Sequence, residues 1–379
     1  MKRVLLFVTA SVASIGLFAQ SMVSTTPSNR NVVIEDLTGI NCGYCPDGAL
    51  RADQVKASAP DRVVIISNHA GSYATPNYSS HPNSLDFRTT EGSSINSLSS
   101  PTGYPAGNVN RMVTSFAMTP GKTAMSRGSW ATVASQVFDL PSPLNLAIEA
   151  HYITGTNKIY VHVEGYYTSN GTGDDYLTVA VLQDNIDGYQ SDYGSPYLYP
   201  ARIQPNGDYR QMDVLRKYLT TPVLGQKIST TAAKSFFEWT QEYTPAQIGP
   251  DVAVVIDDMK IAVFMTEDAG FTEIITATVA DVEERPVGIN ETNALNDLSI
   301  YPNPFQNNAT IDFNLDKSQE IAVNFFDVTG KVVQSVPSTV YNVGNHKINL
   351  DGTNLQSGVY YVNIVAEDGI MTRKVVLNK

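Results

Sequence analysis

Cysteine, tryptophan and charge are all scarce in this sequence. Two Cys and two Trp occur among 379 residues, and Asp, Glu, Lys and Arg together make up 16% of the chain. With two cysteines, the chain cannot carry the dense disulfide framework of small secreted domains. Acidic residues outnumber basic ones by 37 to 25, which leaves a formal net charge of −12. Nucleic-acid binding depends on clustered Lys and Arg, so we expect no nucleic-acid partner.

Long apolar runs are also missing beyond the N-terminus. Lys2 and Arg3 precede an apolar stretch that extends from residue 4 to residue 17 and ends near the small residue Ala19. This order is typical of a secretory signal peptide, so we expect residues 1–19 to be removed by cleavage after Ala19. The stretch is shorter than the roughly 20 residues that span a bilayer. We therefore expect no transmembrane span in the mature chain, and no acyl anchor, since the first cysteine is Cys42.

What the sequence does contain favours β-structure. The chain has 20 Tyr, and polar turn residues separate many short apolar runs. Its length predicts two or three domains at about 150 residues each. Residues 31–37 and 62–68 are candidate strands, with a candidate helix over 46–59 between them, and this order predicts a βαβ unit with parallel strands. We place this α/β domain at residues 31–140, closed by a helix over 129–138.

Beyond residue 140 the pattern changes to strands. Candidate strands recur up to residue 282, which predicts a β-sandwich domain over 144–282 with one short helix around 211–219. The polar residues 283–297 form the predicted linker. In the last part, 298–379, Ile311, Phe313 and Leu315 alternate with polar residues, which predicts a small immunoglobulin-like sandwich. The expected fold class is thus multidomain, with α/β followed by all-β structure.

The two cysteines are the clearest candidates for chemistry. Cys42 and Cys45 enclose Gly-Tyr and lie between the first predicted strand and the predicted helix. At a helix N-terminus the macrodipole and unpaired N–H groups stabilise a thiolate, so Cys42 would be the nucleophile and Cys45 would resolve a mixed disulfide. The alternative is a permanent, inert disulfide in an oxidising compartment. The ring that it closes is small, so its stabilising effect would fall below the roughly 3 kcal/mol of a 15-residue loop.

Residues 38–46, Thr-Gly-Ile-Asn-Cys-Gly-Tyr-Cys-Pro on a βαβ unit, resemble the thioredoxin superfamily. The second matching element is Tyr104-Pro105 before a predicted strand, where thioredoxin-like proteins place a cis-proline against the Cys pair. The resemblance implies a thioredoxin-like domain whose catalytic residues are Cys42, Cys45 and Pro105. The residue before the pair is Asn and the enclosed residues are Gly-Tyr, where thioredoxins usually carry Trp and often Pro. Residues at these positions tune the redox potential.

More narrowly, the stretch from residue 32 to residue 282 resembles the outer-membrane-protein-28-related family of Bacteroidota. The segments that carry the resemblance are the Cys-pair segment, 104–107, 110–111, 213–216 and the strand pair over 260–277. It implies a thioredoxin-like domain followed by a β-sandwich. Two functions stay open. One is thiol–disulfide exchange with a protein thiol or disulfide as substrate, and the other is a non-enzymatic surface binding or structural role on an inert thioredoxin scaffold.

Other candidate sites have ordinary structural explanations, and we assign no metal and no cofactor. A zinc site could add His69 and His81 to the Cys pair, but a single CxxC does not predict zinc. Five acidic residues offer oxygen ligands for calcium, yet none matches an EF-hand loop, so we expect solvated turns: Asp184, Asp187, Asp192, Asp257 and Asp258. Four tyrosines could contact carbohydrate or peptide, or pack over a sandwich edge: Tyr189, Tyr193, Tyr197 and Tyr199.

Three segments of the tail closely resemble the type A sorting domain of type IX secretion. They are Ser-Ile-Tyr-Pro-Asn-Pro-Phe at 299–305, Phe-Asp-Val-Thr-Gly-Lys-Val-Val at 326–333 and Leu-Gln-Ser-Gly-Val-Tyr-Tyr-Val at 355–362, and the match covers 298–379. In that family the domain is read at the outer membrane and removed. The resemblance implies the type IX secretion machinery as partner, and the outer-membrane surface or secretion as destination. The alternative is an ordinary adhesion domain.

Overall fold

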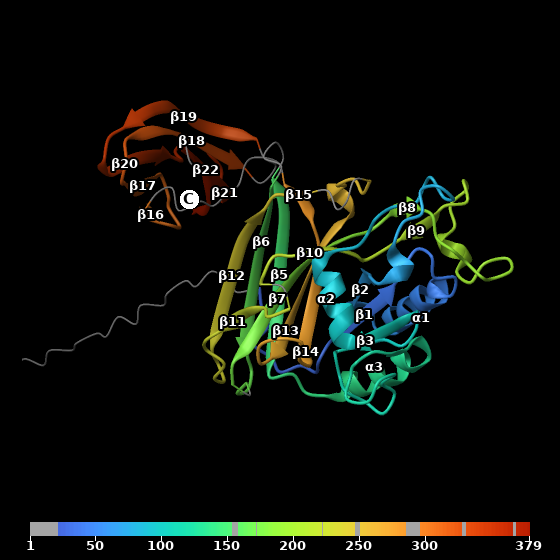
Figure 1. Ribbon diagram of the computed structural model, residues 1–379. Coiled ribbons are helices and arrows are strands. Elements are labelled where there is room, and N and C mark those ends of the chain that lie inside the picture. The colour runs from blue at the N-terminus through green and yellow to red at the C-terminus, as the bar shows by residue number, and fades with distance from the viewer. Residues whose placement is uncertain are drawn as a thin grey trace, which may run out of the picture. The chain divides into compact units, whose positions relative to one another are not determined.

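A computed structural model describes most of the chain (Figure 1). The described residues are 22–153, 158–171, 173–221, 223–246, 251–285, 296–327, 331–366 and 369–379. The predicted signal peptide, 1–19, and most of the predicted linker, 286–295, lie outside them. The chain divides into two compact units: the first contains the residues up to Tyr152 and Lys158–Glu283, and the second contains Ile153–Asn157 and Glu284–Lys379. No helix among the described residues is long and apolar enough to cross a membrane.

The first unit begins with the predicted βαβ arrangement. Strand β1 (Val32–Thr38) pairs in parallel with β2 (Val63–His69), and helix α1 (Cys45–Ser58) connects them. All residues of both strands are buried, which explains the continuous apolar run over residues 63–66 in β2. Strand β3 (Ala106–Val109) adds antiparallel to β1, and β4 (Met125–Ser126) adds to β3.

Three helices cover the two faces of this part of the sheet. Helix α1 and helix α3 (Trp130–Asp139) pack on one face, against alternate side chains of β1 and β2 such as Ile34 and Ile65. Helix α2 (Thr90–Ser99) contributes Ile95 to the core on the opposite face. The strands therefore contribute side chains to two separate hydrophobic cores.

The same sheet continues into the segment predicted as a separate β-sandwich. Its strand order is β14-β13-β7-β10-β2-β1-β3-β4, with β11 also paired to β7. The added strands are β7 (Asp175–Gln183), β10 (Val214–Tyr218), β11 (Gln226–Ile228), β13 (Met259–Glu267) and β14 (Ile274–Asp281). The junction is β10, which pairs in parallel with β2 and antiparallel with β7. Residues of 31–140 and 144–282 thus share one sheet.

Strand β10 corrects one expectation. A short helix was predicted around residues 211–219, but residues 214–218 form a central strand. Val214 and Leu215 are fully buried between two neighbouring strands, where main-chain hydrogen bonding on both edges favours an extended chain. Local sequence spacing could not reveal that these edges were available, so tertiary pairing decided the conformation.

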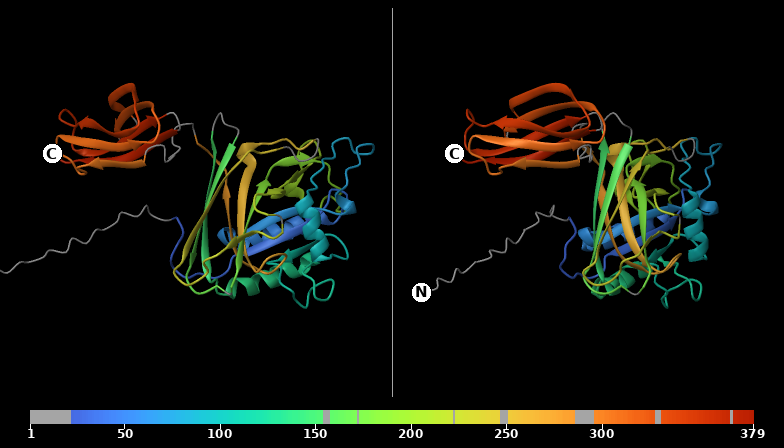
Figure 2. Two further views of the ribbon diagram at one scale, coloured as in Figure 1. Left: turned by 60° about the vertical axis from the view of Figure 1, so that its left-hand side comes forward. Right: turned by 90° about the vertical axis from the view of Figure 1, so that its left-hand side faces the viewer.

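A second sheet faces the first and completes a β-sandwich. It contains β12 (Phe236–Tyr243), β6 (Lys158–Tyr167), β5 (Leu144–Ile153) and β15 (Glu283–Arg285). Side chains from both sheets form one core, with Val161 and Val163 from β6 against Leu177 and Val263 from the large sheet. Figure 2 shows this second sheet, in green to yellow, beside the large sheet in both turned views. The structure thus confirms the predicted β-rich character of this part.

A small hairpin near the Cys pair belongs to neither large sheet. Strands β8 (Ile186–Gly188) and β9 (Tyr209–Gln211) pair antiparallel, and twenty residues lie between them. These include a single 3-10 turn, Pro200–Arg202. Further 3-10 turns of the first unit are Pro60–Arg62, Ser72–Ala74, Arg127–Ser129 and Ile256–Asp258.

The second unit consists of two sheets around its own core. One sheet contains β16 (Asn296–Tyr301), β17 (Asn308–Leu315) and β20 (Gly344–Asp351). The other contains β18 (Gln319–Asp327), β19 (Val332–Tyr341), β21 (Gly358–Ala366) and β22 (Gly369–Leu377). The alternating residues Ile311, Phe313 and Leu315 are buried in the shared core, as the sequence pattern predicts.

Candidate functional site

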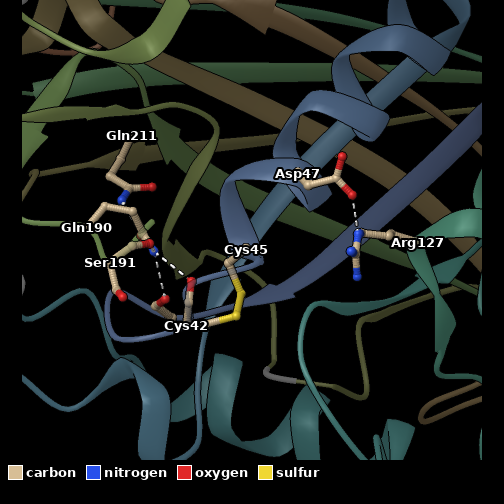
Figure 3. The surroundings of a disulfide bond; sticks show 8 residues. Cys42, Cys45, Asp47, Arg127, Gln190, Ser191 and Gln211 are labelled. Atoms are coloured by element: carbon tan, nitrogen blue, oxygen red, sulfur yellow. Dashed lines mark hydrogen bonds and ion pairs between the residues drawn. A yellow bond between two sulfur atoms is a disulfide. The ribbon is translucent and has the colours of Figure 1, made fainter. Parts of the chain in front are cut away.

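A disulfide joins Cys42 to Cys45, whose Cα atoms lie 5.3 Å apart (Figure 3). Cys42 lies in the turn after β1, and Cys45 is the first residue of α1. Pro46 follows in the first helical turn, where a residue without an N–H is tolerated because the first N–H groups have no helical partner. Both cysteines are buried, with 4% of Cys42 and 2% of Cys45 exposed. The predicted placement of the pair at a helix start is thus observed.

Pro105 lies beside the same helix start. The Tyr104–Pro105 peptide bond is cis, and the next residue, Ala106, pairs with Leu37 near the end of β1. A Cβ on Gly48 in α1 would approach the Pro105 Cβ to 2.8 Å, so the two residues are in close contact and only glycine fits at position 48. The three residues predicted as catalytic therefore come from neighbouring elements around the first turns of α1.

Asp36 of β1 is a buried acid at this site that sequence reasoning missed. It is 2% exposed, and its Oδ1 atom has no hydrogen-bond partner among the described residues. A Cβ on Gly48 would lie 3.7 Å from that atom, which places the carboxyl under the first turns of α1. Burial raises the pKa of Asp36 to about 7, although the nearby Arg202 lowers it. Two adjacent acidic residues inside a predicted buried strand were the available signal.

Charges border the site on the exposed side of α1. Asp47 in the first helical turn forms an ion pair with Arg127, and Arg51 one turn later lies 3.4 Å from the same carboxylate. The negative charge at this position is favoured by the positive end of the helix dipole. The Arg127 guanidinium lies 5.8 Å from the ring centre of Tyr44, one of the two residues between the cysteines.

The tyrosine-rich segment between β8 and β9 lies on the Cys turn. The Ser191 N–H donates to the Ile40 carbonyl at 2.7 Å, and the Tyr193 N–H donates to the Gly43 carbonyl at 2.9 Å. The Gln190 side-chain amide donates to the Cys42 carbonyl at 3.1 Å. Figure 3 shows Gln190 and Ser191 beside Cys42, and Gln211 above Gln190, to which its amide donates. The sequence predicted a contact surface or a sandwich edge here, but not a contact with the cysteines.

The histidines considered as additional zinc ligands make other contacts. His69 is buried against Phe87, with ring centres 4.7 Å apart, and burial lowers its pKa to about 4. His81 stacks on Tyr189 at 3.6 Å. In the described part of the chain, no group of three or more His, Cys, Asp or Glu side chains is placed to hold a metal ion.

The acidic residues considered for calcium are mostly paired within the protein. Asp184 lies 2.7 Å from Lys260, and Asp187 lies 2.8 Å from Arg210. The Asp192 carboxylate accepts hydrogen bonds from the backbone of the segment around it. The Asp258 carboxylate accepts from the Asn185 amide at 2.6 Å.

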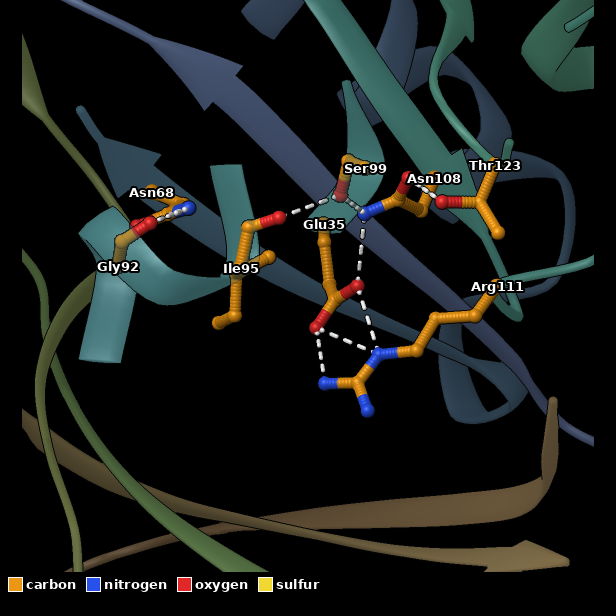
Figure 4. Close-up of polar contacts among 8 residues, drawn as sticks. All are labelled: Glu35, Asn68, Gly92, Ile95, Ser99, Asn108, Arg111 and Thr123. Carbon is orange, nitrogen blue, oxygen red and sulfur yellow. Dashed lines mark hydrogen bonds and ion pairs between the residues drawn. The ribbon is translucent and has the colours of Figure 1, made fainter. Parts of the chain in front are cut away.

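A buried polar network lies on the opposite face of β1 from Asp36 (Figure 4). Glu35 forms an ion pair with Arg111 at 2.6 Å, and both side chains are almost fully buried. The Asn108 amide donates to Glu35 at 2.9 Å and to Ser99 of α2 at 2.8 Å. Neighbouring acids of one strand therefore have different environments, since Glu35 is fully paired and the Asp36 Oδ1 atom is not.

The comparisons with known proteins identify both parts of the chain. Residues 94–291, just over half of the chain, match the family described as outer membrane protein Omp28. The chain belongs to this family. Residues 299–378 match the secretion system C-terminal sorting domain. This Omp28-family protein is therefore exported to the outer-membrane surface or secreted, with its type IX sorting tail addressing the secretion machinery.

The family match begins after the Cys pair. It includes Pro105, the segment 110–111 and β10, but it starts at residue 94, so the cysteines lie outside the matched range. No curated protein matches the chain. Known protein families therefore identify the export route of this Omp28-family protein, while its disulfide has to be interpreted from its own geometry.

Two solved structures align with parts of the chain. One is Salmonella alpha-2-macroglobulin, mutant Y1175G, at 10% identity and a TM-score of 0.23, over 73% of this chain and 18% of that one. The other is E. coli alpha-2-macroglobulin in its native conformation, at 11% identity and a TM-score of 0.19, over 62% and 17%. The chain thus spans less than a fifth of either structure.

Proposed function

We propose that this Omp28-family protein is an exported thiol–disulfide exchange protein with a thioredoxin-like first unit. The observation that carries the proposal is the disulfide at the N-terminus of α1, with Asp36 and Pro105 against the first turns of that helix. The parallel β1-α1-β2 unit and the antiparallel β3 support a thioredoxin-like arrangement. Its substrate would be a protein thiol or disulfide outside the inner membrane.

The reaction needs no component beyond the two cysteines and the substrate. In the reduced protein the Cys42 thiolate attacks one sulfur of a substrate disulfide, forms a mixed disulfide and releases the other substrate sulfur as a thiolate. The Cys45 thiolate then attacks the Cys42 sulfur, re-forms the Cys42–Cys45 disulfide and releases the second substrate thiolate. Two electrons pass from the protein to the substrate. The same steps in reverse oxidise a substrate dithiol.

Neighbouring groups would assist these steps. Unpaired N–H groups and the dipole of α1 stabilise negative charge at its N-terminus, where Cys42 would become the thiolate. Cys45 must lose a proton before it attacks. Asp36 is a buried acid under the first turns of α1, and because burial raises its pKa to about 7 it can accept that proton near neutral pH. Pro105 would shape the surface against which the substrate sulfur lies.

One observation favours a second function. Both cysteines are buried, and the chain's own 190–193 segment contacts the turn that carries Cys42, as expected for an inert structural disulfide. In that case the first unit would be a non-enzymatic binding or structural module at the cell surface. The two functions differ in whether the reduced pair reacts with an external disulfide.

The experiment that tests the proposal is exchange with a model protein disulfide. Reduced protein should reduce the substrate and end with the Cys42–Cys45 disulfide, as measured by thiol trapping and mass spectrometry. Cys42→Ser should abolish the exchange because the attacking sulfur is gone. Cys45→Ser should instead accumulate a mixed disulfide through Cys42, because the resolving sulfur is missing.

The pair of variants also provides the control. Each replaces one sulfur by oxygen, and both remove the disulfide, so a loss of stability should affect both variants alike. Capture of substrate by Cys45→Ser but not by Cys42→Ser therefore reflects the reactivity of the Cys42 thiol and not a loss of stability. If neither the reduced protein nor Cys45→Ser captures substrate, the binding or structural function replaces the proposal.

A further inference from the structure

We propose that residues 189–198, called the cover segment here, form a gate over the Cys42–Cys45 disulfide, which reagents reach only when the segment lifts. The inference rests on the proposed function for its biological meaning, but the gate itself is a property of access to the disulfide. The segment lies between β8 and β9, outside both sheets of the first unit. It contacts the backbone of the turn that carries Cys42, and the disulfide beside it is only 2–4% exposed.

The cover segment is held on the Cys turn mainly through its backbone. Two alternate N–H groups, of Ser191 and Tyr193, donate to the Ile40 and Gly43 carbonyls on either side of Cys42. The Gln190 amide adds hydrogen bonds to the turn, at 3.1 Å to Cys42 and 3.3 Å to Gly39. Such bonds contribute little net free energy, because water replaces them when the segment lifts. The closed state is therefore favoured without being permanent.

Tyr193 closes the cover directly over the residues between the cysteines. A Cβ on Gly43 would lie 2.4 Å from the Tyr193 ring, so the ring rests on the glycine backbone. The same ring contacts Tyr44 edge to face at 5.3 Å. Tyr193 is nevertheless 67% exposed, so its outward face is already in water and lifting the ring disrupts no core.

The base of the cover is anchored on α1, away from the sulfur atoms. The Tyr199 hydroxyl donates to the Asp53 carboxylate at 2.7 Å, and Arg202 pairs with the same carboxylate at 2.6 Å. Within the segment, the Asp192 carboxylate accepts from the Gly194 and Leu198 N–H groups. These contacts keep the cover in one conformation, attached at its end to the helix that carries Cys45.

The other contacts around the Cys turn come from parts that pack into the fold. Pro105 lies against Gly48, and the backbone of Tyr73 lies against Gly39 and accepts a hydrogen bond from the Asn41 N–H. Local opening requires the least free energy where few apolar contacts are lost. Beyond Tyr189, which packs beside the buried Ile40 and Phe87, the cover segment meets this condition. A reagent therefore reaches the sulfurs by lifting residues 189–198.

The test measures reduction of the disulfide in the oxidised full-length protein by dithiothreitol, with the products trapped and quantified by mass spectrometry. Tyr193→Ala should accelerate reduction about tenfold, which corresponds to about 1.4 kcal/mol less stabilisation of the closed state. Tyr199→Phe loosens the anchor without changing charge and should accelerate reduction about fivefold, or about 1 kcal/mol. Neither variant alters a cysteine, Asp36 or Pro105.

Each variant has a matched control. Tyr197→Ala removes a 45% exposed tyrosine of the same segment that takes no part in the contacts above, and Tyr78→Phe removes a tyrosine–aspartate hydrogen bond elsewhere, to Asp251. Both should be reduced at the wild-type rate. Equal rates in all five proteins would overturn the gate, as would acceleration by the controls as large as by the cover variants.

The two proposals fail in different ways. The reduction rates need no protein substrate, so accelerated reduction without any exchange activity would keep the gate and reject the proposed function. Exchange activity together with equal reduction rates in every variant would keep the proposed function and reject the gate.

Discussion

At the scale of single residues, the site depends on two acids that are neighbours in β1. Glu35 and Asp36 point to opposite faces of the sheet, as successive residues of a strand must. The charge of Glu35 is balanced by Arg111, whereas the Asp36 Oδ1 atom has no partner among the described residues. An unbalanced buried acid favours its neutral form, so burial raises the pKa of Asp36 to about 7.

Replacing Asp36 by Asn should change how stability depends on pH. Burial raises the folded-state pKa of Asp36 to about 7, while an unfolded Asp titrates near 3.9, so the folded chain binds a proton that the unfolded chain has lost between these values. This contribution to stability is complete below about pH 4 and is lost as the pH rises through about 7. Asp36→Asn removes the loss and should raise the free energy of unfolding at about pH 8 by roughly 2–4 kcal/mol.

Urea unfolding of the oxidised protein between about pH 5 and pH 8 measures this effect. Asp61→Asn is the control, because Asp61 is exposed and should leave the pH dependence unchanged. The expected variant curve is flatter than the wild-type curve. Parallel curves for wild type and Asp36→Asn would mean that Asp36 is already ionised in the folded protein.

At the scale of elements, the Glu35 network connects three parts of the first unit. Glu35 lies in β1, Asn108 in β3 and Ser99 in α2, and hydrogen bonds join them. Arg111 also lies over the ring of Phe264 in β13, at 5.1 Å. The network therefore links the β1-α1-β2 part to the strands of the sandwich, so the scaffold of the cysteines depends on residues far along the chain.

Arg111→Met should destabilise the first unit by about 3–5 kcal/mol, because it leaves the Glu35 charge buried without its partner. The variant Arg111→Met with Glu35→Gln should recover part of this loss, since no charge then remains buried. Denaturant unfolding of the single and double variants measures the difference. Lys227→Ala removes one side of an exposed ion pair with Asp174 and should change stability by less than about 0.5 kcal/mol.

An additive double variant would contradict this explanation. If the double variant loses as much free energy of unfolding as Glu35→Gln and Arg111→Met lose when added together, the two side chains do not act as a pair. The expected coupling is strong because the guanidinium contacts both carboxylate oxygens, through Nε at 3.0 Å and Nη2 at 2.6 Å.

At the scale of the whole molecule, the disulfide site and the sorting domain lie in different units. The first unit contains the disulfide and its surroundings, and the second contains the sorting domain with an independent core. No residue of the proposed site comes from the second unit. Export and chemistry should therefore be separable by truncation.

A chain that stops at Glu283 should fold its first unit and stay inside the outer membrane. Its disulfide should be reduced at the full-length rate, whereas cell fractionation should find it in the periplasm in place of the surface or medium. Joining residues 299–378 to the truncated chain again should restore delivery. Surface delivery of the truncated chain would mean that the first unit carries its own export signal.

The sequence by itself determined the local features of this protein. The continuous apolar run over residues 63–66 required a strand buried on both faces, and alternation around Ile311 and Phe313 required a two-sided sandwich strand. The spacing of Cys42 and Cys45 before a helix start allowed a disulfide there. These features depend on contacts between residues a few positions apart, which sequence periodicity records.

Tertiary structure alone decided how distant segments meet. Residues 214–218 became a strand because β2 and β7 offer free edges on both sides, and no local pattern reports such edges. Ser191 and Tyr193 came to lie on the Cys turn, about 150 residues away, for the same reason: their hydrogen bonds join backbone groups, which every residue carries. Backbone pairing at long range leaves almost no trace in residue identity, so the cover over the disulfide became visible only in the folded chain.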